Sequence, residues 1–400
     1  MKKIRVAFFA EILIQDFDGA SRTMFQILDR IPKEEFEFIF FCGVPPDKTL
    51  GFEVVQLPTF RIPFNSTYRA VFPHFSKRRM RKKLEEFQPD VIHFASPSPL
   101  GKFAKEYGLK NNIPVIAIYH THFITYIKYY LRKVPFLTPF FYRKAIGVTK
   151  DIYHDPDLVY APTQQIIHEL KTICGLEGKN LKLWQRGINP NLFSPDKKDN
   201  AFLKKITKND LPTILFVSRL VWEKNLQTLI DLYELSEKEN AKVNFVVAGD
   251  GVARKEAERK MPKVHFLGMI DHERLAKLYA SADIYFFPSD TETFGNVVIE
   301  AMASGIPVVV ADGGGPKSFV QNGINGFLCP TKEVRAYWEK IQLLLNDEVL
   351  RAKIINNALT FTRTLSWEHL VSIYFQDIKK LAGHPATPPL PSESIQNNKT

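Results

Sequence analysis

Two glutamates in the C-terminal half of the chain stand on either side of a short turn. Glu292 and Glu300 are separated by seven residues, and Gly295 lies between them. An apolar run over 284–288 precedes the turn and a helical pattern follows it, so the sequence predicts a strand, a loop and a helix. The first amides of a helix lack backbone partners and bind anions such as phosphate, while carboxylates accept hydrogen bonds from sugar hydroxyls. The segment therefore predicts a nucleotide-sugar site.

A pair of cations follows another predicted strand, over 213–218. Arg219 lies at the end of this strand, and Lys224 lies five residues further on, where a helix is expected to begin. Two cations placed in this way can converge on a diphosphate and stabilise the charge that develops as it leaves. Solvated surface cations are the alternative interpretation. Because the pair occurs together with the glutamate motif in the same half of the chain, we favour the diphosphate role. We expect both residues to take part in catalysis.

These motifs resemble those of the retaining GT-B glycosyltransferases of family 4, which carry a Glu-x7-Glu motif and an Arg-Leu-x-x-Glu-Lys signature. The resemblance implies that Glu292 contacts the donor sugar during catalysis and that Glu300 holds the ribose hydroxyls. It also implies that the amides of Phe294, Gly295 and Asn296 receive the distal phosphate. The implied donor is a GDP- or UDP-sugar, and the family needs no bound metal or cofactor.

Several turns at other strand ends belong to the same expected site. Gly249 and Gly251 form a turn of the kind that lets a backbone pass beside the nucleotide, although an ordinary strand-to-helix turn would look the same. Met269 follows a strand where the family's backbone meets the base. Gly19 would let a helix of the N-terminal half approach the donor, with a plain turn as the alternative. The chain departs from the family near Ser318, where relatives commonly carry an acidic residue.

Two histidines follow the predicted strand over 115–119. His120 and His122 are spaced at i and i+2, but no Cys, Asp or Glu joins them, so we expect no metal site. The surrounding Tyr-His-Thr-x-Phe resembles a segment of bacterial lipid-directed mannosyltransferases and of sulfoquinovosyltransferases. This resemblance implies that His120 is a catalytic residue in contact with the donor sugar. A structural role for the imidazole is the alternative.

The rest of the chain must position these residues. With 400 residues and 45% hydrophobic content, the chain is long enough for two domains. Apolar runs alternate with helical patterns in both halves, which predicts parallel sheets covered by helices and ligands at the carboxyl ends of the strands. We expect an α/β protein of the GT-B type, with two Rossmann-like doubly wound domains facing a central cleft. The expected parts are an acceptor-side domain (1–195), a linker (196–210), a nucleotide-sugar-binding domain (211–365), a helix that returns to the first domain (366–382) and a disordered tail (383–400).

The net charge of +11 predicts an anionic partner. Six cations fall within the seven residues 77–83, with Met80, Leu84 and Phe87 at helical spacing, and aromatic residues mix with cations over 126–144. This combination suits a helix lying on an anionic membrane surface. An ordinary amphipathic helix with a solvated basic face is the alternative, and no nucleic-acid-binding module accompanies the charge.

The location of the protein is expected to be cytoplasmic, with peripheral attachment to the inner face of the membrane as a candidate. Three widely spaced cysteines fit neither a zinc site nor a disulfide framework. The N-terminal apolar run is interrupted by Glu11, which argues against a signal peptide. No uncharged apolar run is long enough to span a bilayer.

We predict a retaining glycosyltransferase that moves a hexose, with mannose favoured, from a nucleotide sugar to a lipid or glycan acceptor. No residue in the motifs is poised as a covalent nucleophile, so front-face attack assisted by the leaving phosphate is the working hypothesis. Two alternatives stay open. One is a GT-B-fold nucleotide-sugar epimerase or hydrolase, and the other is a non-catalytic basic protein that binds membranes.

Overall fold

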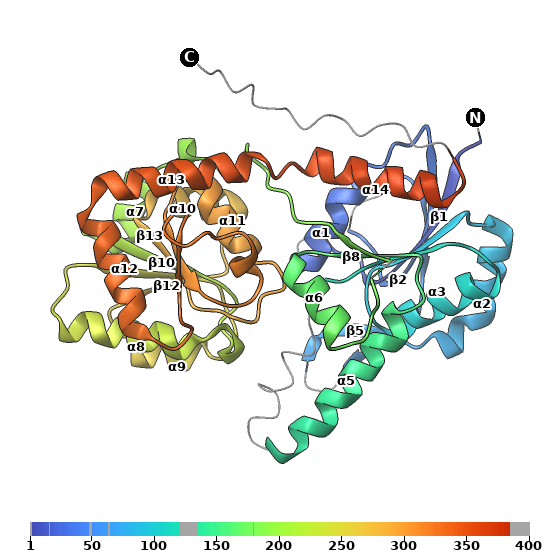
Figure 1. Ribbon diagram of the computed structural model, residues 1–400, viewed down its shortest axis with the longest axis horizontal. Helices are drawn as coiled ribbons and strands as arrows, with labels where there is room; N and C mark the ends of the chain where they lie inside the picture. The colour runs from blue at the N-terminus through green and yellow to red at the C-terminus, as the bar shows by residue number, and fades with distance from the viewer. Residues whose placement is uncertain are drawn as a thin grey trace. The chain divides into compact units, whose positions relative to one another are not determined.

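The computed structural model describes residues 2–15, 17–47, 50–62, 65–120, 135–178 and 180–384. The chain divides into two compact units. The first comprises Met1–Ile124, Phe136–Gln185 and Trp367–Thr400, and the second comprises Thr125–Pro135 and Arg186–Ser366. Each unit is built around a parallel sheet with helices packed on it (Figure 1).

The sheet of the first unit has seven strands in the order β3-β2-β1-β6-β7-β8-β9. All of its neighbouring strands run parallel. Alternate residues of the first strand pack into two separate cores, with Val6 and Phe8 in one and Ala7 and Phe9 in the other. Both faces of the sheet are therefore covered, as expected for a parallel sheet. The strands are β1 (Ile4–Ile12), β2 (Phe36–Val44), β3 (Glu53–Gln56), β6 (Val91–Phe94), β7 (Val115–Ile118), β8 (Leu158–Ala161) and β9 (Leu181–Leu183), beside a two-stranded antiparallel sheet of β4 (Thr59–Ile62) and β5 (Asn65–Val71).

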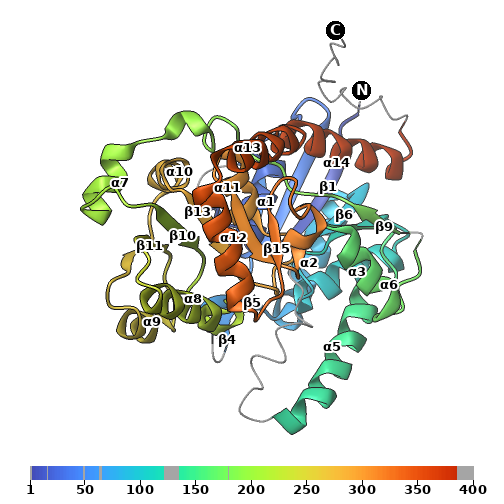
Figure 2. The same cartoon turned by 60° about the vertical axis from the view of Figure 1, so that its left-hand side comes forward.

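The helices of the first unit begin at residues that suit a helix start. Asp18, Ser98 and Thr163 each accept a hydrogen bond from a first-turn amide, and Pro99 follows Ser98 at the first helical position. The helices are α1 (Gly19–Leu28), α2 (Pro73–Phe87), α3 (Pro99–Lys110), α5 (Thr138–Tyr153), α6 (Gln164–Thr172) and α14 (Trp367–Leu381), with a 3₁₀ turn η1 (Pro135–Leu137). In Figures 1 and 2 the amino-terminal end of α5 extends away from the sheet of this unit.

The last helix, α14, packs on the sheet of the first unit although it follows the second unit in sequence (Figure 1). The Trp184 indole N–H donates to the carbonyl of Leu370 at 2.8 Å, and the Tyr160 hydroxyl donates to the Asp377 carboxylate at 2.5 Å. His93 Nδ1 and the Tyr374 hydroxyl form a buried hydrogen bond of 2.6 Å. Burial lowers the pKa of His93 to about 3, so its ring is neutral near pH 7.

The sheet of the second unit has six parallel strands in the order β12-β11-β10-β13-β14-β15. The strands are β10 (Thr213–Val217), β11 (Asn244–Ala248), β12 (His265–Gly268), β13 (Ile284–Phe287), β14 (Val308–Ala311) and β15 (Phe327–Cys329). The helical segments are η2 (Pro195–Lys197), α7 (Asn200–Thr207), η3 (Trp222–Lys224), α8 (Leu226–Lys238), α9 (Arg254–Lys260), α10 (His272–Ser281), α11 (Asn296–Ala303), η4 (Gly315–Ser318), α12 (Val334–Asn346) and α13 (Glu348–Arg363).

The division between the units falls after Gln185, earlier than residue 195 where the first domain was expected to end. The reason is that Ile188 and Phe193 already belong to the apolar core of the second unit. The backbone N–H of Ile188 also donates to the carbonyl of Leu365 in that unit. The predicted architecture of two doubly wound, Rossmann-like α/β domains is confirmed.

Candidate active site

The second unit contains a point at which the order of its strands reverses. The chain runs from β10 outwards to β12 and then returns to place β13 on the other side of β10. Ile214 pairs with Ile284 and Leu215 with Tyr285, so the carboxyl ends of β10 and β13 are neighbours. Open α/β sheets bind ligands at such a reversal. The loops that leave these two strands carry the predicted residues Arg219, Lys224 and Glu292.

Lys224 and Glu292 meet directly, although they lie 68 positions apart in sequence. The Lys224 ammonium donates to Glu292 Oε1 at 2.6 Å. Lys224 is 3% exposed, whereas the side chain of Glu292 is 22% exposed. A carboxylate that remains partly open to solvent beside a buried ammonium can still reach a ligand. Arg219, on the same loop as Lys224, is exposed.

The helix after Glu292 starts without a capping side chain. Gly295 is the N-cap of α11 and has φ 95°, and no side chain in the described part of the chain caps this end. A Cβ on Gly295 would lie 2.8 Å from Pro316 Cγ, which favours glycine here for both conformation and space. The side-chain oxygen of Asn296 is buried and accepts no hydrogen bond from the described residues. An open helix start beside this acceptor is suited to a phosphate and a hydroxyl group.

Phe294 and Glu300 are both buried. The Phe294 ring is 4% exposed and packs on Phe319, so only its backbone can contribute to binding. Glu300 is 7% exposed, and the Tyr279 hydroxyl lies 3.4 Å from its carboxylate. Burial, and then the charges of Glu300 and Glu292, raise the pKa of Tyr285. The charges of both glutamates therefore act on the same buried tyrosine.

The turn after β11 supports the loop that carries Arg219. A Cβ on Gly249 would lie 1.9 Å from the carbonyl oxygen of Ser218, and one on Gly251 would lie 2.4 Å from that of Leu220. Because glycine has no Cβ, the two glycines allow this turn to pack directly against the loop after β10. This packing role does not depend on contact with a nucleotide. The Gly249 N–H donates to Gly268 O at 2.8 Å, and the next residue, Met269, is 75% exposed.

A third loop supports Glu292, and the sequence interpretation did not assign this role. Gly315 N–H donates to the carbonyl of Glu292 at 2.7 Å. A Cβ on Gly314 would lie 2.8 Å from Asp290 O, and one on Gly315 would lie 2.4 Å from atoms of Phe294. The signal available in the sequence was the run of three glycines directly after an apolar strand.

The remaining predicted residues, Gly19 and His120, belong to the first unit. Gly19 is the first residue of α1, where the Asp18 carboxylate accepts from the Ser21 N–H at 2.8 Å and so caps the helix. His120 lies shortly after β7 and is half-buried. Its neighbour His122 lies outside the described residues. The structure thus brings together the residues of the second unit, and Gly19 and His120 stand at the carboxyl edge of the first unit's sheet.

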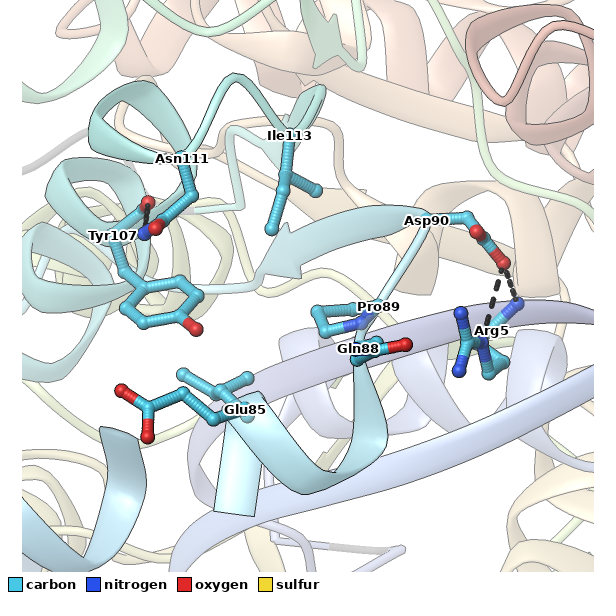
Figure 3. A pocket seen from close by; sticks show the side chains of 9 residues that line it. Arg5, Glu85, Gln88, Pro89, Asp90, Tyr107, Asn111 and Ile113 are labelled. Atoms are coloured by element: carbon cyan, nitrogen blue, oxygen red, sulfur yellow. Dashed lines mark hydrogen bonds and ion pairs between the residues drawn. The ribbon is translucent and has the colours of Figure 1, made fainter. Parts of the chain in front are cut away.

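One hollow of about 410 Å³ lies at the opposite, amino edge of the first unit's sheet (Figure 3). Arg5 and Asp90 form one side of it, and Glu85, Tyr107 and Asn111 form the other. None of the predicted site residues lines it.

Among the described residues, no group of three His, Cys, Asp or Glu side chains could hold a metal ion. In the same part of the chain, no helix has the length and apolarity needed to cross a membrane.

Family models of known proteins match both halves of this chain. A family model described as "Glycosyl transferases group 1" matches residues 197–361, and one described as "Glycosyltransferase Family 4" matches residues 17–192. A GDP-mannose-dependent alpha-mannosyltransferase from Corynebacterium glutamicum is 28% identical over 384 residues, covering 94% of this chain and 89% of the relative. The sulfoquinovosyl transferase SQD2 from Arabidopsis thaliana is 27% identical, covering 92% of this chain and 71% of the relative.

Solved structures agree on the fold. The structure of HepE from Anabaena in complex with UDP superposes with a TM-score of 0.72 at 18% identity, covering 94% of this chain and all of that chain. The fold is therefore GT-B, as the sequence predicted. The two family models together account for most of the residues, and the chain belongs to the group 1, family 4 glycosyltransferases.

Proposed function

We propose that this protein is a retaining glycosyltransferase that moves a hexose, with mannose favoured, from a nucleoside-diphosphate sugar to a lipid or glycan acceptor. The observation that carries the proposal is the contact between Lys224 and Glu292 at the strand reversal, beside the open start of α11. This arrangement offers a cation, a carboxylate and a helix N-terminus on one edge of one sheet.

The chemistry follows from the charges. Arg219 and Lys224 would hold the diphosphate and stabilise its charge as the bond to the sugar breaks. The amides of Phe294, Gly295 and Asn296 would receive the distal phosphate. Glu292 would accept hydrogen bonds from sugar hydroxyls. Front-face attack, in which the leaving phosphate takes the proton of the acceptor hydroxyl, requires no covalent nucleophile from the protein.

The rest of the donor would be held by residues that the sequence singled out. Glu300 would bind the ribose, and Gly249, Gly251 and Met269 would flank the base. Gly19 and His120 would contribute from the first unit, with His120 contacting the sugar. No metal or cofactor is required in this scheme. The GDP-mannose dependence of the Corynebacterium relative supports the mannose preference. The UDP bound to HepE supports a uracil nucleotide as the alternative donor base.

Two surfaces of the first unit support an acceptor at the inner face of a membrane. Most cations of the basic segment 77–83 on α2 are exposed. On and next to α5, Phe136 is 77% and Phe140 is 65% exposed. One part of the sequence interpretation needs correction, because Met80 and Leu84 are fully buried in the core of the unit. Met80 and Leu84 therefore face the unit's own core, while the basic face and the exposed Phe75 of α2 remain available to lipid.

The test is a thermal-shift panel of UDP, GDP and ADP and their common sugars, on the wild type and on Glu300→Gln. We expect one nucleotide to raise the melting temperature of the wild type and to lose this effect in the variant. Glu348→Gln, which neutralises an exposed glutamate of α13, serves as the matched control and should respond like the wild type.

Transfer is then assayed with the stabilising donor and lipid or glycan acceptors, and the anomeric configuration of the first product is read by NMR. Retention of configuration supports the proposal, and inversion overturns the mechanism. Consumption of the donor without an acceptor would favour the epimerase or hydrolase, while vesicle binding without any nucleotide response would favour the non-catalytic membrane protein.

A further inference from the structure

Lys224 is fixed to the Glu292 loop by its two chain neighbours as well as by its own ammonium group. The loop after β10 contributes Glu223, Lys224 and Asn225, and the loop after β13 contributes the residues that lead to Glu292. We propose that Asn225 and Thr291 are positioning residues, which clamp these loops together and set the Lys224 ammonium against the leaving diphosphate. This inference rests on the proposed transferase function.

The first half of the clamp is the Thr291 hydroxyl, which donates to the carbonyl of Glu223 at 2.9 Å. Thr291 is 5% exposed and directly precedes Glu292, while Glu223 directly precedes Lys224. The fully buried Ser289 hydroxyl lies 3.3 Å from the Thr291 hydroxyl and can donate to it. Loss of the Thr291 hydroxyl would leave the half-buried Glu223 carbonyl without this donor, and the loop would then be free to move.

The second half is the side-chain amide of Asn225, which donates to the carbonyl of Pro288 at 3.0 Å. Asn225 has φ 56°, a left-handed conformation that asparagine adopts more readily than most residues. It ends η3 and begins α8, so the chain turns sharply directly after Lys224. The Glu223 carbonyl and the Asn225 side chain thus hold the chain on both sides of Lys224 to the segment that precedes Glu292.

These bonds explain how a long, flexible side chain can serve as a fixed charge. A lysine ammonium has three donors and a four-carbon stem with considerable rotational freedom. With Nζ 2.6 Å from Glu292 and the side chain 4% exposed, little of that freedom remains. Preorganised charge is most effective where negative charge develops in the transition state. A shift of the η3 loop would therefore weaken stabilisation of the leaving group more than it weakens binding of the ground state.

The experiment compares Thr291→Val, Thr291→Ser and Asn225→Gly in the full chain. Valine removes the hydroxyl at nearly constant shape, serine restores it, and glycine keeps the left-handed backbone while removing the amide. Thr362→Val is the matched control, because Thr362 is 3% exposed and its hydroxyl donates to Leu359 O at 3.1 Å within α13. For each variant we measure kcat, the donor KM, the Kd of the nucleoside diphosphate and the melting temperature.

We expect Thr291→Val and Asn225→Gly to lower kcat about 10- to 100-fold, the scale of loss seen when reacting groups are misplaced. The donor KM should rise less than about threefold, since the lost interaction is weaker with the intact donor than in the transition state. Thr291→Ser should recover most of kcat, and Thr362→Val should keep the wild-type kcat. Adding Thr291→Val to Lys224→Met should lower kcat no further, because the clamp acts through Lys224.

Wild-type kcat in both clamp variants, with melting temperatures lowered as in Thr362→Val, would overturn the inference and leave the proposed function intact. Additive losses in the double variant would also overturn it, since the clamp would then not act through Lys224. A wild type that transfers no sugar from any donor would instead remove the proposed function, and the inference with it.

Discussion

Glu11 is a single residue whose ionisation should be visible in the stability of the protein. It lies near the carboxyl end of β1, is partly buried, and its carboxylate accepts from the Val71 N–H at 2.8 Å. Burial raises the pKa of Glu11 above 4.5, and hydrogen bonds from Ser98 and from the backbone of Val71 and Leu100 act in the opposite direction. The folded protein therefore holds the ionised carboxylate less readily than the unfolded chain does.

We predict that Glu11→Gln stabilises the protein near neutral pH and not in acid. Below the ordinary pKa both states are protonated, so the group makes no difference. As the pH rises towards the raised pKa of the folded state, the unfolded chain ionises first. The wild type then loses about 1.4 kcal/mol for each pH unit that separates the folded-state pKa from the unfolded-state pKa. The gain of the variant in the free energy of unfolding should thus grow as the pH rises above the ordinary glutamate pKa and level off once the folded-state carboxyl ionises, as measured by urea denaturation.

An equal gain at all pH values would contradict this assignment, because the effect would then come from packing. Glu34→Gln is a suitable control, since Glu34 is exposed.

At the scale of elements, α2 and α5 present charge and aromatic rings to solvent on one unit. Lys105 fixes the carboxyl-terminal part of α5, since its buried ammonium donates to Asp155 Oδ2 at 2.9 Å and to the carbonyl of Asp151. The other end of α5 carries Phe140, whose ring meets that of Phe141 edge-on at 5.3 Å. A helix anchored at one end and aromatic at the other suits contact with the interface of a bilayer.

We predict that the protein floats with vesicles that contain anionic phospholipid and stays unbound with neutral vesicles. Each cation near such a surface contributes about 1 kcal/mol, and salt screens the attraction. Reversing the charge of three exposed cations on α2 (Arg78→Glu, Arg81→Glu and Lys82→Glu) should therefore abolish flotation at moderate salt.

The matched control makes the same change of net charge on the second unit, with Lys238→Glu, Lys242→Glu and Arg259→Glu. These residues lie on or near α8 and α9. Equal loss of binding in both triple variants would show that total charge decides, and the α2 surface would then have no special part. Replacing Phe136 and Phe140 with serine separates the aromatic contribution from the charge.

At the scale of the whole molecule, the sequence predicts elements better than contacts. The apolar runs indicated β7, β10 and β13 to within a few residues, because buried parallel strands are continuous in hydrophobicity. The charged motifs also indicated that Arg219, Lys224 and Glu292 follow the carboxyl ends of their strands. The 2.6 Å contact between Lys224 and Glu292 depends on which strands are neighbours, and no local pattern records that order.

The sequence also did not predict where loops pack closely against one another. Gly249 and Gly315 look like ordinary turn glycines, and only the neighbouring loops show that a Cβ would collide with backbone atoms. The burial of Met80 and Leu84 had a similar cause, since helical spacing shows that a stripe exists but not whether a sheet or a membrane covers it.

The path of the chain leads to a prediction about the stability of each unit. A chain that ends at Ser366 keeps the whole continuous segment of the second unit, but it removes α14 from the first. Tyr374 and Ile378 are fully buried there and Trp367 is 7% exposed. Each large apolar side chain stabilises the fold by roughly 1.5–3 kcal/mol when fully buried, so the loss is comparable to the stability of a typical domain.

We therefore expect the truncated chain to lose structure in the first unit while the second unit stays folded. Hydrogen exchange read by mass spectrometry should show lost protection in β1, β6 and β8 and wild-type protection in β10 and β13. Asp377→Asn in the full chain is the milder comparison, because it weakens the contacts with Tyr160 and Lys182 and leaves the apolar burial in place. Protection lost equally in both units would mean that they fold as one cooperative body, with α14 stabilising the second unit as much as the first.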